Sequence, residues 1–196
     1  MAFVLELMIL GFLAEGPLHG YELRRKMNEL YGFAREVSDG SLYPAIQRLI
    51  KAGIVARRVE KGRAAQRHTL ELTPGGREDL HHRLRTASAG DVSDLGRFMV
   101  LLAFLSELPS VEEQHEVLRR RLQFLEAPAS FFYEEGRPLR RAEIQDVYRQ
   151  GMLTIGQATR KAEIDWIRHI LGNQLSDEAA QPSALLREQG EAGTRE

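Results

Sequence analysis

Residues 38–51 read SDGSLYPAIQRLIK and are the most informative part of the sequence. It predicts a helix with two faces of different chemistry. Ser41 or Ser38 can cap the free N–H groups of a first turn, and Pro44 is expected where a missing N–H costs nothing. Apolar residues recur at helical spacing and are expected to face a core. These residues are Leu42, Ile46, Leu49 and Ile50.

The opposite side of this predicted helix is polar and carries no acidic residue. It consists of Tyr43, Pro44, Gln47, Arg48 and Lys51. An exposed helix N-terminus with hydroxyl, amide and cationic side chains is suited to phosphates and to the edges of bases. The stretch therefore predicts a DNA recognition helix, in which Ser38 and Ser41 contact phosphate.

Composition favours a folded protein with two differently charged halves. The 196 residues are 43% hydrophobic, enough for a core, and the absence of cysteine excludes disulfides, thiolate zinc sites and cysteine nucleophiles. The net charge of −1 hides an asymmetry. Residues 1–85 hold 14 Lys and Arg against 10 Asp and Glu, whereas the rest holds 13 against 18. Opposite signs predict two separate roles.

The apolar runs of the chain are not typical of targeting or membrane segments. Residues 1–13 are interrupted by Glu6, and no basic segment precedes them, which argues against a signal peptide. Residues 98–104 are too few to span a bilayer. We therefore expect a cytoplasmic protein without membrane contact.

The segments around the predicted recognition helix complete a known pattern. A wide apolar helix ends near Gly16, and residues 21–31 form a second helix. After the third helix, residues 54–60 and 66–72 predict a β-hairpin with a basic tip. Thr73 is then expected to cap a fourth helix whose first residue is Pro74.

The order helix–helix–helix–hairpin–helix is that of a winged helix-turn-helix. In this fold the third helix enters the major groove, and the hairpin tip, or wing, reaches the backbone or the minor groove. The basic residues expected at the tip are Lys61, Arg63 and Arg67.

The chain after residues 86–90 is predicted to be wholly helical. We expect helices over about 92–106, from Pro109 onward, and over about 139–171. The last helix carries a seam of apolar residues, typical of helices that pair with a second chain. The seam is Ile144, Val147, Met152, Ile155, Ile164, Ile167 and Leu171. The predicted domains are a winged helix over 1–86, a helical dimerisation and effector domain over 91–173, and a disordered tail over 174–196.

Three strings of the sequence resemble the PadR family of bacterial transcriptional regulators. They are LHGYEL at residues 18–23, DGSLYPAIQRL at 39–49 and LTPGG at 72–76, and the resemblance covers most of residues 1–84. It implies a homodimer on a palindromic operator, with C-terminal helices forming the dimer. Many members are repressors released by a small aromatic or lipophilic ligand. The chain departs from the family at Leu70, where Tyr is usual.

Other candidate residues have competing explanations. Tyr21 suits helix packing and a phosphate contact equally well, whereas Arg24, Arg25 and Arg57 are interpreted as solvated surface. For a small aromatic or lipophilic effector, the aromatic residues of the C-terminal part offer the contacts, with Trp166 first. The candidate effector residues are Trp166, Phe98 and Tyr148.

No catalytic or metal constellation is predicted. Glu112 and His115 resemble half of a di-iron motif without its second copy, and Asp165 with His169 is typical of a helix-surface ion pair. No glycine-rich phosphate loop or nucleophile elbow occurs. We therefore expect neither enzyme, cofactor nor metal.

The prediction as a whole is a mainly α protein with a small β-hairpin that acts as a ligand-responsive, dimeric repressor on double-stranded DNA. One alternative is a dimeric winged-helix module that binds protein instead of DNA. A helical enzyme acting on small molecules is the third option.

Overall fold

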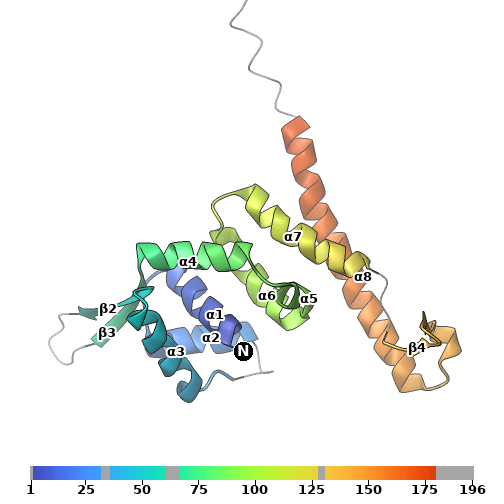
Figure 1. Ribbon diagram of the computed structural model, residues 1–196, viewed down its shortest axis with the longest axis horizontal. Helices are drawn as coiled ribbons and strands as arrows, with labels where there is room; N and C mark the ends of the chain where they lie inside the picture. Colours follow the sequence, from blue (N-terminus) through green and yellow to red (C-terminus); the bar gives the residue numbers. More distant parts are fainter. Residues whose placement is uncertain (1, 32–35, 61–66, 128–130, 180–196) are drawn as a thin grey trace, which may run out of the picture. The chain divides into compact units, whose positions relative to one another are not determined.

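The chain divides into two compact units, Met1–Phe124 and Leu125–Glu196 (Figure 1). The computed structural model describes residues 2–31, 36–60, 67–127 and 131–179. Within these ranges, no helix is both long enough and apolar enough to cross a membrane.

The first unit begins with a winged helix-turn-helix, as predicted. Its elements are α1 (Ala2–Glu15), β1 (Leu18–His19), α2 (Gly20–Tyr31), α3 (Asp39–Lys51), β2 (Val55–Glu60), β3 (Arg67–Leu72) and α4 (Pro74–Arg85). The strands β2 and β3 form the predicted hairpin, with Val55 opposite Leu72. A third strand, β1, was not predicted; it pairs antiparallel with β3 and gives the sheet order β1-β3-β2.

Helix α1 lies at the centre of this unit and packs against α2, α3, α4 and β3. Several of its apolar residues, among them Leu7, Ile9 and Leu10, are fully buried. Gly11 allows a close approach, because a Cβ there would lie 2.3 Å from the ring of Phe104. Leu70 is also buried, so it contributes to the core at the position where the resembled family usually has Tyr.

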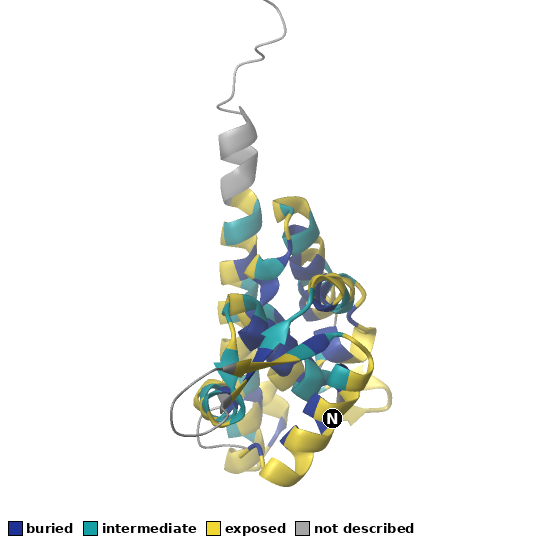
Figure 2. Ribbon diagram, turned by 90° about the vertical axis from the view of Figure 1, so that its left-hand side faces the viewer, coloured by how far each residue is buried: buried dark blue, intermediate teal, exposed yellow. Residues whose placement is uncertain are grey.

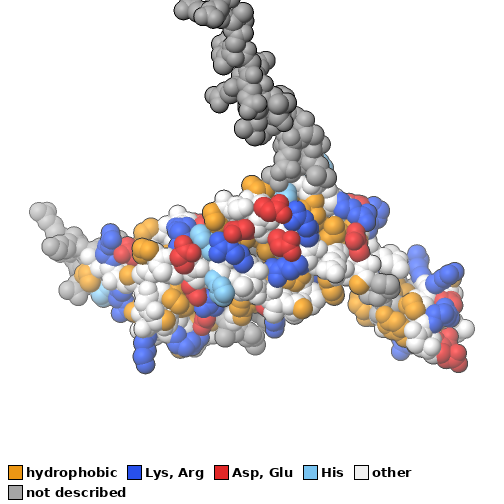
Figure 3. Space-filling model, turned by 45° about the horizontal axis from the view of Figure 1, so that its top comes forward, with side chains coloured by type: hydrophobic (Ala, Val, Ile, Leu, Met, Phe, Trp, Pro, Cys, Tyr) orange, Lys and Arg blue, Asp and Glu red, His pale blue; other side chains and the backbone are white. Residues whose placement is uncertain are grey.

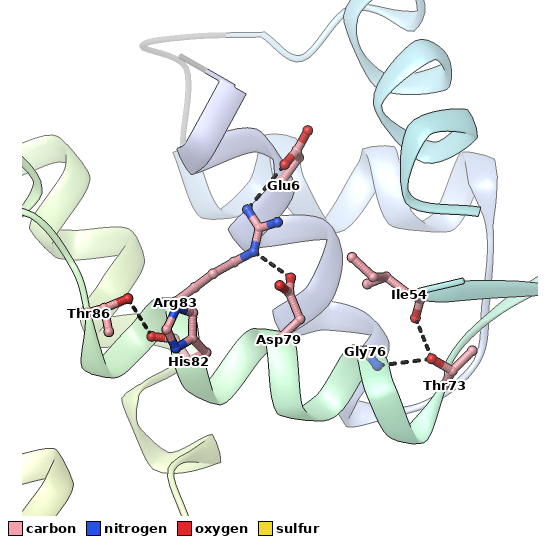
Figure 4. A network of polar contacts seen from close by, with 8 residues as sticks. All are labelled: Glu6, Ile54, Thr73, Gly76, Asp79, His82, Arg83 and Thr86. Carbon is pink, nitrogen blue, oxygen red and sulfur yellow. Dashed lines mark hydrogen bonds and ion pairs between the residues drawn. The ribbon is translucent and has the colours of Figure 1, made fainter. Parts of the chain in front are cut away.

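The end of the hairpin is tied to the start of α4 (Figure 4). Thr73 caps α4, accepting a hydrogen bond from the backbone N–H of Gly76 at 2.9 Å, and Pro74 follows at the first helical position, as predicted. The Thr73 hydroxyl also lies 3.0 Å from the carbonyl oxygen of Ile54. A Cβ at Gly76 would lie 2.1 Å from that same oxygen. Only glycine therefore lets α4 approach the start of β2 this closely.

Helix α3 begins earlier than the position of Pro44 suggested. Ser38 is the N-cap by its extended backbone, and its carbonyl accepts the N–H of Leu42 at 3.0 Å. The expected cap by a serine hydroxyl is wrong, because the Ser38 side chain makes no capping hydrogen bond and the Ser41 hydroxyl donates to the Ser38 carbonyl. The expectation that Pro44 lies in the first turn is wrong, because α3 already starts at Asp39. Pro44 lies in the second turn and is exposed, so the N–H that it lacks would have served the carbonyl of Gly40.

The rest of the first unit is helical but more broken than predicted. It contains α5 (Ala89–Ser93), α6 (Leu95–Ala103), the 3-10 helix η2 (Leu105–Glu107) and most of α7 (Val111–Glu126). The single helix expected over 92–106 is wrong, because Asp94 ends α5 and caps α6 by accepting the N–H of Arg97 at 2.8 Å. A capping box of Ser88 and Asp91 starts α5. The domain boundary expected between residues 86 and 91 stays a prediction.

Arg121 of α7 lies fully buried in the first unit. Its guanidinium donates to the carbonyls of Val92 and Ser93 at 2.7 and 2.8 Å. The group also lies over the rings of Phe98 and Phe124, at 4.7 and 5.4 Å from their centroids. The Arg121 side chain therefore links α7 to the end of α5, where the chain turns into α6.

The second unit contains strands, which corrects the prediction of a wholly helical C-terminal part. The strands β4 (Tyr133–Glu134) and β5 (Arg137–Pro138) pair antiparallel. Between them, Glu135 and Gly136 both have positive φ, of 51° and 77°. A two-residue turn with positive φ at both positions matches the twist of a hairpin, and Gly136 adopts it without strain.

The last helix begins later than predicted. Helix α8 (Val147–Ala179) follows the 3-10 helix η3 (Arg141–Glu143), whereas the sequence suggested a start near Leu139. Asp146 sets the start, because its carboxylate accepts the N–H groups of Tyr148 and Arg149 at 2.8 and 2.9 Å. The helix reaches Ala179, inside the predicted tail of 174–196. Residues 180–196 lie outside the described residues, so a disordered tail stays a prediction.

Candidate nucleic-acid interface

Helix α3 has the two faces that its sequence predicts. Leu42, Ile46 and Leu49 are buried, and Ala45 lies with them. The five residues of the opposite side, here called the α3 outer face, are all exposed. They are Tyr43, Pro44, Gln47, Arg48 and Lys51. The exposed side chains are available to a partner without disturbing the core.

The α3 outer face has a centre and two edges. At about 100° per residue, Tyr43 and Arg48 lie about 140° apart around the helix, with Gln47 and Lys51 between them. Tyr43 therefore forms one edge and Arg48 the other. An amide and an ammonium group at the centre can hydrogen-bond to base edges and phosphates.

At one edge, Arg48 forms an ion pair with another residue of its own chain. Its guanidinium donates to the carboxylate of Glu6 on α1 at 3.1 Å. The second oxygen of Glu6 accepts from Arg83 at 3.1 Å, and Arg83 also bonds Asp79 at 2.5 Å (Figure 4). The charge of Arg48 is thus partly balanced before any ligand approaches.

The start of α3 is polar but not purely cationic. The hydroxyl of Ser41 donates to the carbonyl of Ser38 at 2.9 Å, and the two hydroxyls lie 3.3 Å apart. Asp39 pairs with Arg24 at 2.8 Å, so Arg24, expected to be merely solvated, orders this helix start. Both serines are exposed and remain candidates for phosphate contacts.

At the other edge, Tyr43 borders a cavity. The cavity has a volume of about 550 Å³ and lies among β1, the start of α2, α3 and the two hairpin strands. Tyr21, which is 59% exposed, stacks on His19 with 5.8 Å between ring centroids. The residues that line the cavity are His19, Gly20, Tyr21, Tyr43, Ile46, Arg57, His68 and Leu70.

Sequence reasoning missed His19 and His68 and assigned Arg57 to the solvated surface. Arg57 and Arg58 are neighbours on β2, and side chains alternate between the two faces of a strand. The structure places Arg57 at the cavity, whereas Arg58 pairs with Glu71 at 3.1 Å. The alternation of side chains along a strand predicts that the two arginines lie on opposite faces of β2. Which of the two faces the cavity was not evident from the sequence.

The side chains expected on the wing fall outside what the structure describes. Lys61 and Arg63 lie outside the described residues, and of Arg67 only the backbone, at the start of β3, is described. Their proposed contacts stay predictions.

The three candidate effector residues lie in different environments. Phe98, in the first unit, is 1% exposed and lies against Arg121. Tyr148 and Trp166, both on α8 in the second unit, are 84% and 42% exposed. An effector site formed by these residues stays a prediction.

The carboxylates of the metal-like and dyad-like patterns, Glu112 and Asp165, are both engaged in ion pairs. Arg119 hydrogen-bonds to Glu112 and thereby lowers the pKa of that carboxyl, and Lys161 pairs with Asp165. Among the described side chains, no group of three or more His, Cys, Asp or Glu could hold a metal ion. Basic and acidic side chains also lie next to one another on the face shown in Figure 3.

Comparison with known proteins gives a family match for the winged helix. The model of the transcriptional regulator PadR-like family matches residues 9–82. A 75-residue stretch is 39% identical to an uncharacterised 37.1 kDa protein in transposon TN4556 of Streptomyces fradiae, covering 38% of this chain and 20% of that protein. The chain thus spans about a fifth of that relative's length.

A longer match joins the chain to a named regulator. It is 27% identical over 128 residues to the negative transcriptional regulator PadR of Bacillus subtilis, covering 65% of this chain and 70% of that protein. The crystal structure of Bacillus subtilis PadR in complex with operator DNA is similar with a TM-score of 0.41 and 22% identity, over 86% of this chain and 97% of that chain. The complex of the same protein with p-coumaric acid gives 0.40 and 23%, over 86% and 97%.

Proposed function

Residues 9–82 place this chain in the PadR-like family of transcriptional regulators, and from this premise we propose that it binds a specific palindromic operator as a homodimer. The observation that carries the proposal is the α3 outer face: five exposed side chains without a carboxylate, on a helix anchored by its buried side. Such a helix can enter the major groove of B-DNA.

In the proposed complex, the two edges and the centre of α3 have different roles. Gln47 and Lys51 would contact base edges, whereas Ser38, Ser41 and Tyr43 would contact phosphates. Arg48 would contribute after it leaves Glu6. Tyr21 on α2, and Lys61, Arg63 and Arg67 on the wing, would add backbone contacts.

The homodimer would be formed by α8. At about 100° per residue, four large side chains fall within about 60° of one another around this helix. They form what we call the α8 apolar face: Tyr148, Met152, Ile155 and Trp166. All four are at least 42% exposed in the single chain, and exposed residues recur along α8 in Figure 2. A two-fold partner would bury the same face of both copies.

Repression and ligand response belong to the same proposal. The relative of Bacillus subtilis is called a negative transcriptional regulator, which supports a repressor. A small aromatic or lipophilic effector near Phe98, Tyr148 or Trp166 would favour a dimer whose recognition helices no longer match the half-site separation of about 34 Å. A coupling of about 2–3 kcal/mol would lower operator affinity about 30–150-fold.

The test is fluorescence anisotropy with labelled DNA from upstream of the protein's own gene, at several salt concentrations and with excess random competitor. We expect competitor-resistant binding that weakens linearly with log salt, and a slope reduced by about 1 in Lys51→Ala. Lys161→Ala removes the same cation from α8 and should leave the slope unchanged.

Wild-type protein that binds no DNA at low salt would contradict the proposal. It would favour the alternative, a dimeric winged-helix module for a protein partner, which the acidic excess after residue 85 suits.

A further inference from the structure

The cavity at the Tyr43 edge lies between the two parts of a winged helix that touch DNA. Its lining residues come from α3, which would occupy the major groove, and from β2 and β3, the two strands of the hairpin, as well as from β1 and the start of α2. The sugar-phosphate backbone of DNA separates the major groove from the adjacent minor groove. It must therefore pass between the protein elements that enter the two grooves. The cavity is therefore placed where a phosphodiester would come closest to the sheet.

The lining of the cavity has an apolar floor and a cation at its rim. Ile46 and Leu70 are 1% and 4% exposed and form the floor. Arg57 is exposed and makes no ion pair with any described residue, in contrast to Arg58, which is held by Glu71. A guanidinium without a carboxylate partner, set beside a hollow, is suited to a phosphate.

The rings around Arg57 add hydrogen-bonding groups. The Nδ1 atom of His19 lies 3.1 Å from the carbonyl oxygen of His68. Because a carbonyl oxygen only accepts, this nitrogen carries the hydrogen, and the tautomer of His19 is assigned by that contact. The Tyr43 hydroxyl is a further donor. An added Cβ on Gly20 would lie 3.5 Å from it, so the phenol stands directly over the start of α2.

One carboxylate opposes an anion at this site. Glu22 accepts the backbone N–H of His19 at 2.9 Å and the hydroxyl of Tyr21 at 3.3 Å. The first of these bonds is the main reason why the pKa of Glu22 is lowered, so the group is charged at neutral pH. Glu22 orders the rim, while its charge weakens any phosphate contact nearby.

We propose that this cavity seats one backbone phosphate of DNA in each half-site, with Arg57 as the cation and Tyr43, His19 and His68 as the surrounding polar groups. The inference rests on the proposed function, because it assumes that α3 faces DNA. Arg57 becomes a positioning residue, since the phosphate that it holds fixes how deeply and at which register α3 enters the groove, without reading sequence.

The test compares Arg57→Ala with its matched neighbour Arg58→Ala in the full-length protein, on a random-sequence duplex at low salt and on operator DNA. For Arg57→Ala we expect about tenfold weaker binding to both duplexes and a salt slope smaller by about 1. For Arg58→Ala we expect wild-type binding. Leu70→Phe, which fills the floor without changing charge, should weaken binding in the same way, with circular dichroism to confirm folding.

Neutral methylphosphonate linkages placed one at a time along a half-site give the decisive readout. One linkage should weaken wild-type binding about tenfold and have no effect on Arg57→Ala, because the two changes remove the same contact. Two results would overturn the phosphate site while leaving the proposed function intact. In the first, wild type binds DNA but Arg57→Ala and Arg58→Ala lose equal affinity. In the second, every linkage that weakens wild type weakens Arg57→Ala as well. Wild-type protein that binds neither duplex would overturn the proposed function and the seat together.

Discussion

Helices α3 and α8 each leave a broad face exposed, but the chemistry of the two faces is opposite. The α3 outer face is polar around a single aromatic residue, Tyr43. The α8 apolar face exposes four large side chains, among them Ile155 at 69% and Tyr148 at 84%. A polar face is stable in water and suits a polar ligand, whereas exposed apolar area favours burial against protein. The difference supports the proposed contact of α3 with DNA and the proposed pairing of α8 with a second copy of the chain.

The largest expected effect comes from destabilising the winged helix, on which the position of α3 depends. In Gly76→Ala the new Cβ would lie 2.1 Å from the carbonyl oxygen of Ile54, a backbone atom that also accepts the N–H of Thr73. We expect a loss of about 3 kcal/mol in the free energy of unfolding, measured by urea denaturation, together with loss of DNA binding.

The control for this substitution is its neighbour. A Cβ at Gly75 would meet only the Thr73 hydroxyl, at 3.9 Å, so Gly75→Ala should unfold like wild type. Equal stability of the two variants would contradict the close approach of α4 to β2.

The next largest effect is expected at the α8 apolar face. Ile155→Glu places a charge on the α8 apolar face, and in a two-fold dimer it does so twice. Since a buried Ile contributes about 2 kcal/mol, we expect the dissociation constant of the dimer to rise at least about a hundredfold in sedimentation experiments.

Gln157→Glu adds the same charge to the opposite, exposed side of α8 and should leave the dimer intact. If both variants sediment alike, another surface forms the dimer.

A smaller effect concerns how strongly α3 is held by its own protein. Glu6→Gln should release Arg48, whose side chain is 57% exposed, while Arg83 keeps its pair with Asp79. Because the freed cation can reach DNA, we expect binding to be about three- to tenfold tighter at low salt and about 1 kcal/mol lower stability. The control is Glu15→Gln, also on α1, which breaks the pair of Glu15 with Lys26 of α2 and should not change DNA affinity.

The smallest effect lies just before α8 and depends on pH. A hydrogen bond from the Arg137 side chain and one from the backbone of Arg140 lower the pKa of Glu143 to about 2 from its usual 4.5. A lowered pKa means that this pair stabilises the fold above pH 4.5 and loses its contribution as the pH falls from 4.5 towards 2.

An NMR titration of the Glu143 carboxyl should report the lowered value, and Arg137→Gln should return it towards 4.5. Both DNA binding and the dimer should be unaffected, because this ion pair belongs neither to the α3 outer face nor to the α8 apolar face.

The sequence predicted features that depend on neighbours along the chain. The alternation of Leu42, Ile46 and Leu49 with the α3 outer face follows from helical periodicity, and Thr73 with Pro74 marks the start of α4 by local chemistry. The winged-helix order followed from these signals.

The misses have two physical causes. Some local signals were overlooked: Asp146 as a cap of α8, and the Glu135-Gly136 turn between β4 and β5. Others are contacts between distant residues. The Arg48–Glu6 pair spans 42 positions, and the cavity joins β1 to β3, so neither periodicity nor propensity contains them.

The hydroxyl of Thr73 also has a consequence for the order of folding. It bonds the carbonyl oxygen of Gly53 at 2.8 Å across 20 positions, and this contact encloses the whole β2–β3 hairpin. Closing so short a loop costs little chain entropy compared with the long-range packing of α1 against α4. We therefore expect the end of α3, the hairpin and the first turn of α4 to assemble early as one kinetic unit, onto which α1 docks later.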